Sequence, residues 1–146
     1  MTEEAPENGT EPRLRVYLSI RGDFDPLAFS VTVGLSGDWT MRRGEHNPAR
    51  GVPRCDAWAI EVAERHSYDV EAMVEELLMR LTGHEDRIAA TVRAWDLDAS
   101  LIIVAYWNIE ESSSPALGLS TEQMACLARL GAVLDVDLYA RCSDCK

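Results

Sequence analysis

A chain of 146 residues, 47% apolar and 27% charged, has the size and composition of a single soluble domain. Its longest apolar run, residues 101–107, is far too short to span a bilayer, and its net charge of −11 disfavours binding to nucleic acid or to anionic membranes. The acidic, polar residues 1–12 contain no secretory signal, so we expect a cytoplasmic protein with a disordered acidic tail, one domain over residues 13–141 and a short C-terminal tail at residues 142–146.

The domain is predicted to open with a strand that turns directly into a helix. Apolar and polar residues alternate from residue 13 to residue 21, which is the period of a strand with one buried face. Gly22 ends this strand, and Asp25 followed by Pro26 supplies a helix N-cap and a proline at the first helical position. We expect the helix to run over residues 26–33 and to end at Gly34.

Two further strands and a long helical segment are expected next. Residues 38–43 and 56–62 predict a hairpin across a loop rich in glycine and proline, with Trp39 and Met41 on one side. Asp69 caps a helix whose apolar stripe reaches residue 81, and a second helix covers residues 85–95. Residues 100–107 are apolar at nearly every position, which predicts a central strand covered on both sides.

The C-terminal part is predicted to be a helix followed by a strand. Ser120 and Gln123 have the spacing of a capping box for a helix that ends at Gly131, and residues 133–141 alternate as a strand. The order of elements predicts an α+β two-layer sandwich, with a mainly antiparallel five-stranded sheet and helices packed on one face. Its core is similar to a split βαβ unit, to which the C-terminal helix and strand are added.

Three separated segments are similar to those of a known bacterial family. They are Tyr17-Leu-Ser-Ile-Arg-Gly-Asp-Phe-Asp-Pro26, Trp39 with Arg42-Arg43-Gly44-Glu45, and Leu134-Asp-Val-Asp-Leu-Tyr139. In order and spacing the chain resembles the family called domain of unknown function 4279 over about residues 13–140. The tryptophan-arginine-lysine-glycine segment usual in that family is Trp39-Thr-Met-Arg-Arg-Gly44 here. The resemblance implies no assigned activity, and it suggests a link to bacterial toxin–immunity gene sets.

An arginine-rich loop is one candidate site. Trp39, Arg42, Arg43 and Arg50 lie close together in the sequence, and guanidinium groups on such a loop can hold a phosphate or a carboxylate in bidentate fashion. The alternative, which we favour, is that these arginines pair with carboxylates of the chain itself, such as Asp56.

The polar sides of the first and last strands form a second candidate site. If the two strands are neighbours, their polar residues share one face, which would either be held together by cross-strand pairing or bind a partner or a second copy. These residues are Arg15, Tyr17, Arg21, Asp135, Asp137 and Tyr139. We interpret the first and last strands as partners in the sheet.

No residue pattern predicts a particular chemistry. Cys142 and Cys145 form one isolated C-x-x-C pair, whereas a structural zinc site needs four ligands, so we predict neither a metal nor a cofactor. The chain contains no phosphate-binding glycine motif and no nucleophile elbow. We therefore expect a non-enzymatic binding protein that contacts a protein partner, as an immunity or regulatory component would. The alternative is a module that binds an anionic metabolite or nucleotide at the arginine-rich loop.

Overall fold

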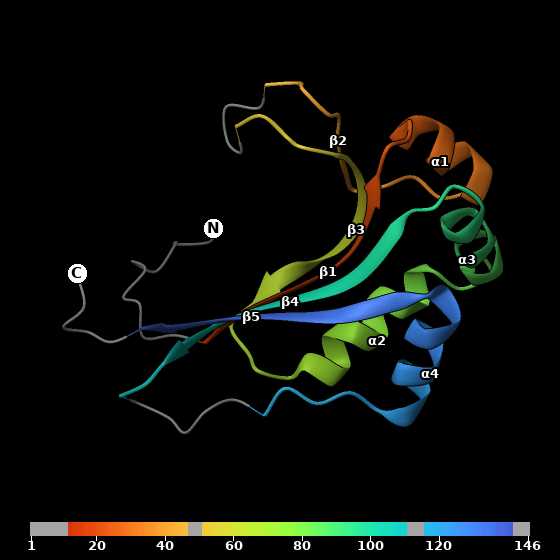
Figure 1. Cartoon of the computed structure of the whole chain (residues 1–146). Helices are drawn as coiled ribbons and strands as arrows, with labels where there is room; N and C mark the ends of the chain where they lie inside the picture. The colour runs from red at the N-terminus through yellow and green to blue at the C-terminus, as the bar shows by residue number, and fades with distance from the viewer. Residues whose placement is uncertain (1–11, 47–50, 111–115, 142–146) are drawn as a thin grey trace, which may run out of the picture.

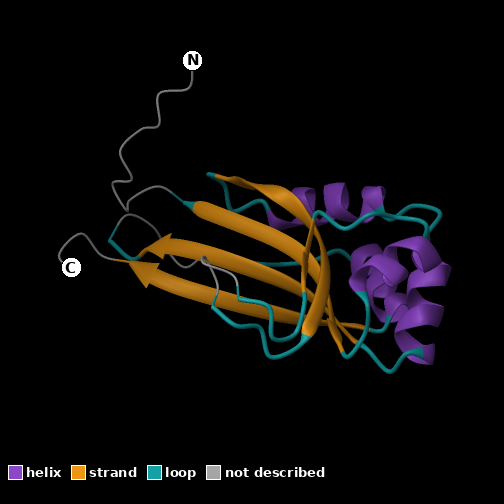
Figure 2. Cartoon of the chain, turned by 90° about the horizontal axis from the view of Figure 1, so that it is seen from above, coloured by secondary structure: helices purple, strands orange, loops and turns teal. Residues whose placement is uncertain are grey.

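A mixed sheet forms one layer of the protein, and helices form the other (Figures 1 and 2). The structure, a computed structural model, describes residues 12–46, 51–110 and 116–141. The elements in chain order are β1 (Arg13–Gly22), α1 (Pro26–Val33), β2 (Trp39–Met41), β3 (Asp56–Arg65), α2 (Val70–Arg80), α3 (Glu85–Ala94), β4 (Asp98–Asn108), α4 (Thr121–Leu130) and β5 (Ala132–Arg141). The predicted α+β class is confirmed, whereas the predicted tails at residues 1–11 and 142–146 lie outside the described residues.

Helix α1 begins and ends where its sequence signals place it. The Asp25 carboxylate accepts a hydrogen bond from the Leu27 N–H at 3.0 Å, and Pro26 occupies the first turn. Gly34 ends the helix in the left-handed conformation, with φ of 73°, which glycine adopts at no steric cost. The strand-to-helix turn is thus fixed by local chemistry.

The same turn is anchored to the sheet by a buried carboxylate. Asp56, the first residue of β3, accepts hydrogen bonds from the backbone N–H of Phe24 at 3.0 Å and of Arg43 at 2.8 Å. It is only 5% exposed. One side chain therefore joins the β1–α1 turn, the segment after β2 and the start of β3.

The strand order is β2-β3-β1-β4-β5, so the predicted pairing of the first strand with the last is wrong. Strand β1 pairs antiparallel with β3 and β4, and β4 separates it from β5. The predicted β2–β3 hairpin is confirmed, with Trp39 opposite Ala59. Strand β5 pairs parallel with β4 because α4 carries the chain back across the helix layer before β5 begins.

The core lies between the helices and one face of the sheet. Alternate residues of β1, β3 and β4 are fully or almost fully buried there against apolar residues of the helices. The largest of these side chains are Trp58, Phe29, Leu14, Leu18, Ile20, Ile60, Met73, Leu77, Leu81, Ile88, Leu101 and Ile103. The opposite face of the sheet, called the open face below, carries no helix among the described residues (Figures 1 and 2).

Candidate functional site

Aromatic and arginine side chains cross the open face from β2 to β5. At the β2 side, the rings of Trp39 and Tyr17 lie 5.8 Å apart, and the Arg15 guanidinium lies 4.7 Å from the centre of the Tyr17 ring. Arg15 also forms an ion pair with Glu61 on β3. These three strands therefore present their open-face side chains as one packed group.

A second group continues this pattern towards the β5 edge. The rings of Tyr106 on β4 and Tyr139 on β5 are stacked, with centroids 5.2 Å apart and planes inclined by 19°. The Arg13 guanidinium lies 5.2 Å from the centre of the Tyr106 ring and 3.1 Å from the Glu64 carboxylate. We call Trp39, Tyr17, Arg15, Arg13, Tyr106 and Tyr139 the aromatic–arginine row. Tryptophan, tyrosine and arginine are the residue types enriched at the centres of protein interfaces.

The strand register places all six predicted partner-surface residues on the open face. Arg15, Tyr17 and Arg21 are in register with Val104, Ile102 and Asp98 of β4. Three positions of β5 face the same way, because in parallel pairing they match open-face residues of β4. They are Asp135, Asp137 and Tyr139. The six residues therefore share one face of the sheet, although β4 lies between the two sets.

The carboxylates of β5 differ from the arginines of β1 in their surroundings. Arg13 and Arg15 have ion-pair partners on β3, whereas Asp135 and Asp137 are exposed and have no ion-pair partner among the described residues. Tyr139 is 51% exposed although it stacks on Tyr106. On β5, the groups of the open face that are available for new polar contacts are therefore acidic and aromatic.

The arginine-rich loop does not converge on a site within the described residues. The Arg42 guanidinium lies 2.9 Å from the Asp25 carboxylate and 3.8 Å from that of Asp56, so it is engaged by the chain itself, as the favoured alternative predicted. Trp39 belongs to the aromatic–arginine row instead, and the Arg43 side chain is exposed. The fourth member of the predicted set, at position 50, lies outside the described residues.

The environment of Asp56 keeps its carboxyl group ionised. Burial by itself raises the pKa of this group, but the N–H donors of Arg43 and Phe24 and the nearby guanidinium groups of Arg42 and Arg43 outweigh that effect. The net result is a pKa below the ordinary aspartate value. Asp56 is thus a structural anion that positions the loop, rather than a proton donor.

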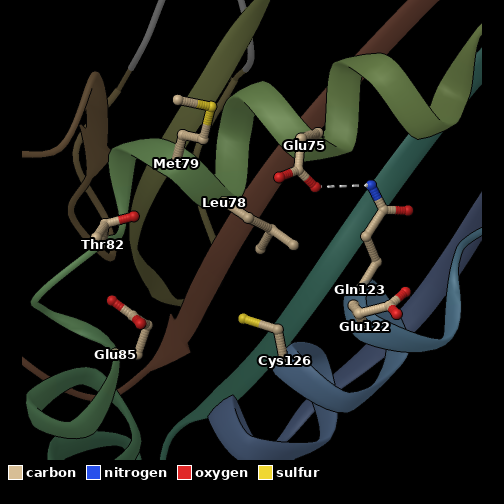
Figure 3. A pocket seen from close by; sticks show the side chains of 8 residues that line it. All are labelled: Glu75, Leu78, Met79, Thr82, Glu85, Glu122, Gln123 and Cys126. Carbon is tan, nitrogen blue, oxygen red and sulfur yellow. Dashed lines mark hydrogen bonds between the residues drawn. The ribbon is translucent and has the colours of Figure 1, made fainter.

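An acidic hollow of about 220 Å³ lies among α2, α3 and α4 on the helix side of the molecule (Figure 3). Three glutamates, Glu75, Glu85 and Glu122, line it together with the thiol of Cys126. The Gln123 amide donates hydrogen bonds to the backbone carbonyl of Glu71 at 2.8 Å and to the Glu75 carboxylate at 3.4 Å. Two of the lining residues, Gln123 and Glu75, therefore join α4 to α2.

The groups in this hollow are poorly suited to catalysis. Burial raises the pKa of the Cys126 thiol, which leaves less of the reactive thiolate at neutral pH. Burial also tends to raise the pKa of Glu85, but backbone N–H donors and Arg129, 2.7 Å away, lower it overall. A carboxyl group with a lowered pKa is a weak general base.

Sequence analysis missed the residues that link the two halves of the open face. Tyr106 was included in a continuous apolar run, and Arg13 was assigned only to the start of a strand. The available signal was the alternation in Arg13, Arg15 and Tyr17, which puts all three on one face. Which β4 residue lies opposite Arg13 depends on strand pairing, and the register shows that it is Tyr106.

Comparisons with known proteins give the family. A domain of unknown function, DUF4279, matches residues 12–141. The chain belongs to this family. The DUF4279 match contains every described strand and helix, so the open face and the helix-side hollow both lie within it. No curated protein and no solved structure matches the chain.

Two features are absent from the part of the chain that the structure describes. No helix there is long and apolar enough to cross a membrane. In the same part of the chain, no group of three or more histidine, cysteine, aspartate or glutamate side chains is arranged to hold a metal ion. The C-x-x-C pair at residues 142 and 145 lies outside the described residues.

Proposed function

We propose that this DUF4279 protein is a non-enzymatic binding protein of the bacterial cytoplasm that holds a basic protein partner on its open face. The observation that carries the proposal is the aromatic–arginine row, which crosses the face of the sheet that no described helix covers. Tyrosine and tryptophan side chains contribute a large contact area at a small cost in side-chain entropy, and Arg13 and Arg15 are already held by ring and carboxylate contacts.

The charge of the partner follows from the groups that remain available on the β5 side of that face. Asp135 and Asp137 have no ion-pair partner among the described residues, and Tyr139 offers a half-exposed ring beside them. Arginine or lysine side chains of a partner would pair with the carboxylates and lie over the ring. The net charge of −11 would also accelerate the approach of a basic protein. A toxin held by its immunity protein, or the target of a regulatory protein, would meet this description.

Capture from the native cell tests the proposal. Tagged wild-type protein is expected to retain a basic protein in near-equal amount, and Asp137→Arg is expected to lose it because the reversed charge repels the partner. Asp23→Arg is the matched control, since Asp23 is an exposed aspartate in the turn between β1 and α1. The proposal would be contradicted if the captured protein is acidic, or if Asp137→Arg retains it as well as the wild type does. It would also be contradicted if no protein is retained at low or at physiological salt.

The anionic-ligand alternative remains a prediction with less support. Arg42 is engaged by Asp25 and Asp56, so Arg43 is the described arginine of that loop best placed to meet a ligand. In a thermal-shift assay with phosphorylated and carboxylate compounds, we expect no compound to stabilise the wild-type protein more than it stabilises Arg43→Ala. A stabilisation of ~2.7 kcal/mol at 100 times the dissociation constant, lost in that variant, would instead support the alternative.

A further inference from the structure

Strand β5 forms a long edge of the sheet. It contains Ala132–Arg141, pairs with β4 along its whole length, and has no strand on its other side among the described residues (Figure 1). The opposite edge is β2, which spans only Trp39–Met41. The β5 edge is therefore one regular strand, whereas the opposite edge is divided between β2 and the part of β3 that extends beyond it.

The described length of β5 lacks the usual features that prevent edge strands from pairing. Natural edges are protected by lysines, prolines, bulges, short length or charges that point towards the core. Strand β5 contains neither lysine nor proline, and its register with β4 is regular from Ala132 to Arg141. Its helix-side positions are apolar and are incompletely covered: Leu134 is 48% exposed, Val136 41% and Leu138 46%.

We infer that β5 pairs antiparallel with β5 of a second copy of this chain, about a two-fold axis through Leu138. Such an axis is perpendicular to the sheet, so each residue meets another of the same face. The two five-stranded sheets then form one continuous sheet. The inference concerns the edge of β5 and is independent of the partner proposed for the open face.

The charges of β5 select the register. An axis through Val136 would place Asp135 opposite Asp137, and an axis through Asp137 would place that residue opposite itself. Like charges directly opposite each other destabilise a strand pair. An axis through Leu138 places Asp135 opposite Arg141 and Asp137 opposite Tyr139. An axis through Asp135 would likewise place that residue opposite itself. Among the axes that pair seven or more residues of β5, the one through Leu138 is therefore the one that opposes no carboxylates.

The apolar side of β5 fits the same register. Leu138 lies opposite its own copy, and Val136 lies opposite Ala140, so all helix-side pairs within residues 135–141 are apolar. Pairing covers part of the helix-side surface of β5 that is exposed in one chain. It also satisfies backbone groups of the edge without introducing an unmatched charge.

Charge reversal tests the inference on the purified full chain, with no other protein present. Sedimentation equilibrium is expected to give a concentration-dependent dimer for the wild type. Asp135→Arg and Arg141→Asp are each expected to weaken the dimer about tenfold or more, because each opposes like charges twice across the axis. The double variant restores the opposite-charge pairs, so its dissociation constant is expected to return to the wild-type value.

Asp137→Arg is the matched control, because it faces Tyr139 in this register and is expected to leave the dimer unchanged. The same variant is expected to lose the open-face partner, so the two proposals can fail separately. Near-wild-type melting temperatures show that the variants are folded. A chain that stays monomeric at every accessible concentration would overturn the inference. The inference would be overturned equally if the chain stays monomeric and its β5 amides gain hydrogen-exchange protection only when another protein is bound. A dimer strengthened by Asp135→Arg, or a double variant that stays weak, would overturn it too.

Discussion

Replacing Asp56 by alanine is expected to cost more stability than any exposed substitution in this chain. The carboxylate accepts two backbone hydrogen bonds, from Phe24 at 3.0 Å and from Arg43 at 2.8 Å, in a site where it is 5% exposed. Alanine removes both acceptors and leaves the two N–H groups without their partner. It also leaves Arg42 without one of its two carboxylates.

The size of the effect follows from these contacts. A hydrogen bond to a charged group contributes ~1.5–3 kcal/mol, and a buried donor left unsatisfied costs ~1–3 kcal/mol. Water will reach part of the site after truncation, so we expect the free energy of unfolding to fall by about 3 kcal/mol. Asp56→Asn retains one carbonyl oxygen and is expected to lose about half as much. Asp23→Ala, which removes an exposed carboxylate near the same turn, is expected to change stability by less than ~0.5 kcal/mol.

The effect of Asp56 also depends on pH, with a definite sign. Its pKa in the folded protein lies below the unfolded value of ~3.9, so its contribution is complete above that value. The contribution is lost as pH falls through the folded pKa. The stability difference between wild type and Asp56→Asn should therefore be constant near neutral pH and shrink below about pH 4.

Urea denaturation followed by tryptophan fluorescence measures these differences. The reasoning is refuted if Asp56→Ala costs less than ~1 kcal/mol, because the two hydrogen bonds then contribute little. It is also refuted if the asparagine variant equals the wild type at neutral pH. A difference that grows in acid would show that the pKa of Asp56 is raised by its burial rather than lowered by its donors.

Three further predictions concern other parts of the fold. Gly37→Ala places a Cβ 2.8 Å from the buried Trp58 ring, and urea denaturation is expected to show a loss of ~1–3 kcal/mol; an unchanged midpoint would mean that the ring moves freely. Ser120→Ala removes the N-cap of α4 and is expected to lower the free energy of unfolding by ~1 kcal/mol, whereas Ser120→Asp is expected to retain most of the wild-type stability. The hydrogen bond from Arg80 is the main cause of the lowered pKa of Asp38, opposed by burial, so Arg80→Ala should raise that pKa in an NMR titration; no change would contradict the pairing.

Local sequence signals predicted the elements because their causes are local. Asp25 and Pro26 fix the start of α1 through one hydrogen bond and one constrained dihedral angle, and Ser120 with Gln123 fixes the start of α4. In each case the groups that determine the boundary lie within a few residues of it. The observed bounds of α1 are those predicted.

Strand neighbours depend on contacts between distant residues, and the prediction failed there. We interpret the first and last strands as partners from their sequences, but polar residues that could pair across two strands do not specify that the strands are adjacent. The order β4–α4–β5 is itself a strand–helix–strand unit, which usually makes two parallel neighbours. That rule would have placed β5 beside β4.

The residues of the predicted partner surface nevertheless share one side of the sheet, for a physical reason. Alternation with a period of two fixes the side of the sheet on which a residue lies, whichever strand is adjacent. Arg15, Tyr17 and Tyr139 therefore share a face even though another strand separates them. The bridging contact through Tyr106 was not predictable in this way, because it requires the register of β1 against β4.

The geometry of β5 connects the two proposals and separates their tests. Pairing about a two-fold axis perpendicular to the sheet would place the open faces of both copies on the same side. A dimer would thus present two aromatic–arginine rows to one side, each with Asp137 beside Tyr139. Two partner molecules per dimer are expected when each row acts alone, and one when a partner spans the axis. Measuring the mass of the complex distinguishes these cases. Asp135→Arg, which weakens the dimer, provides a second test: it would shift the ratio of partner to chain towards one to one only if a single partner spans the axis.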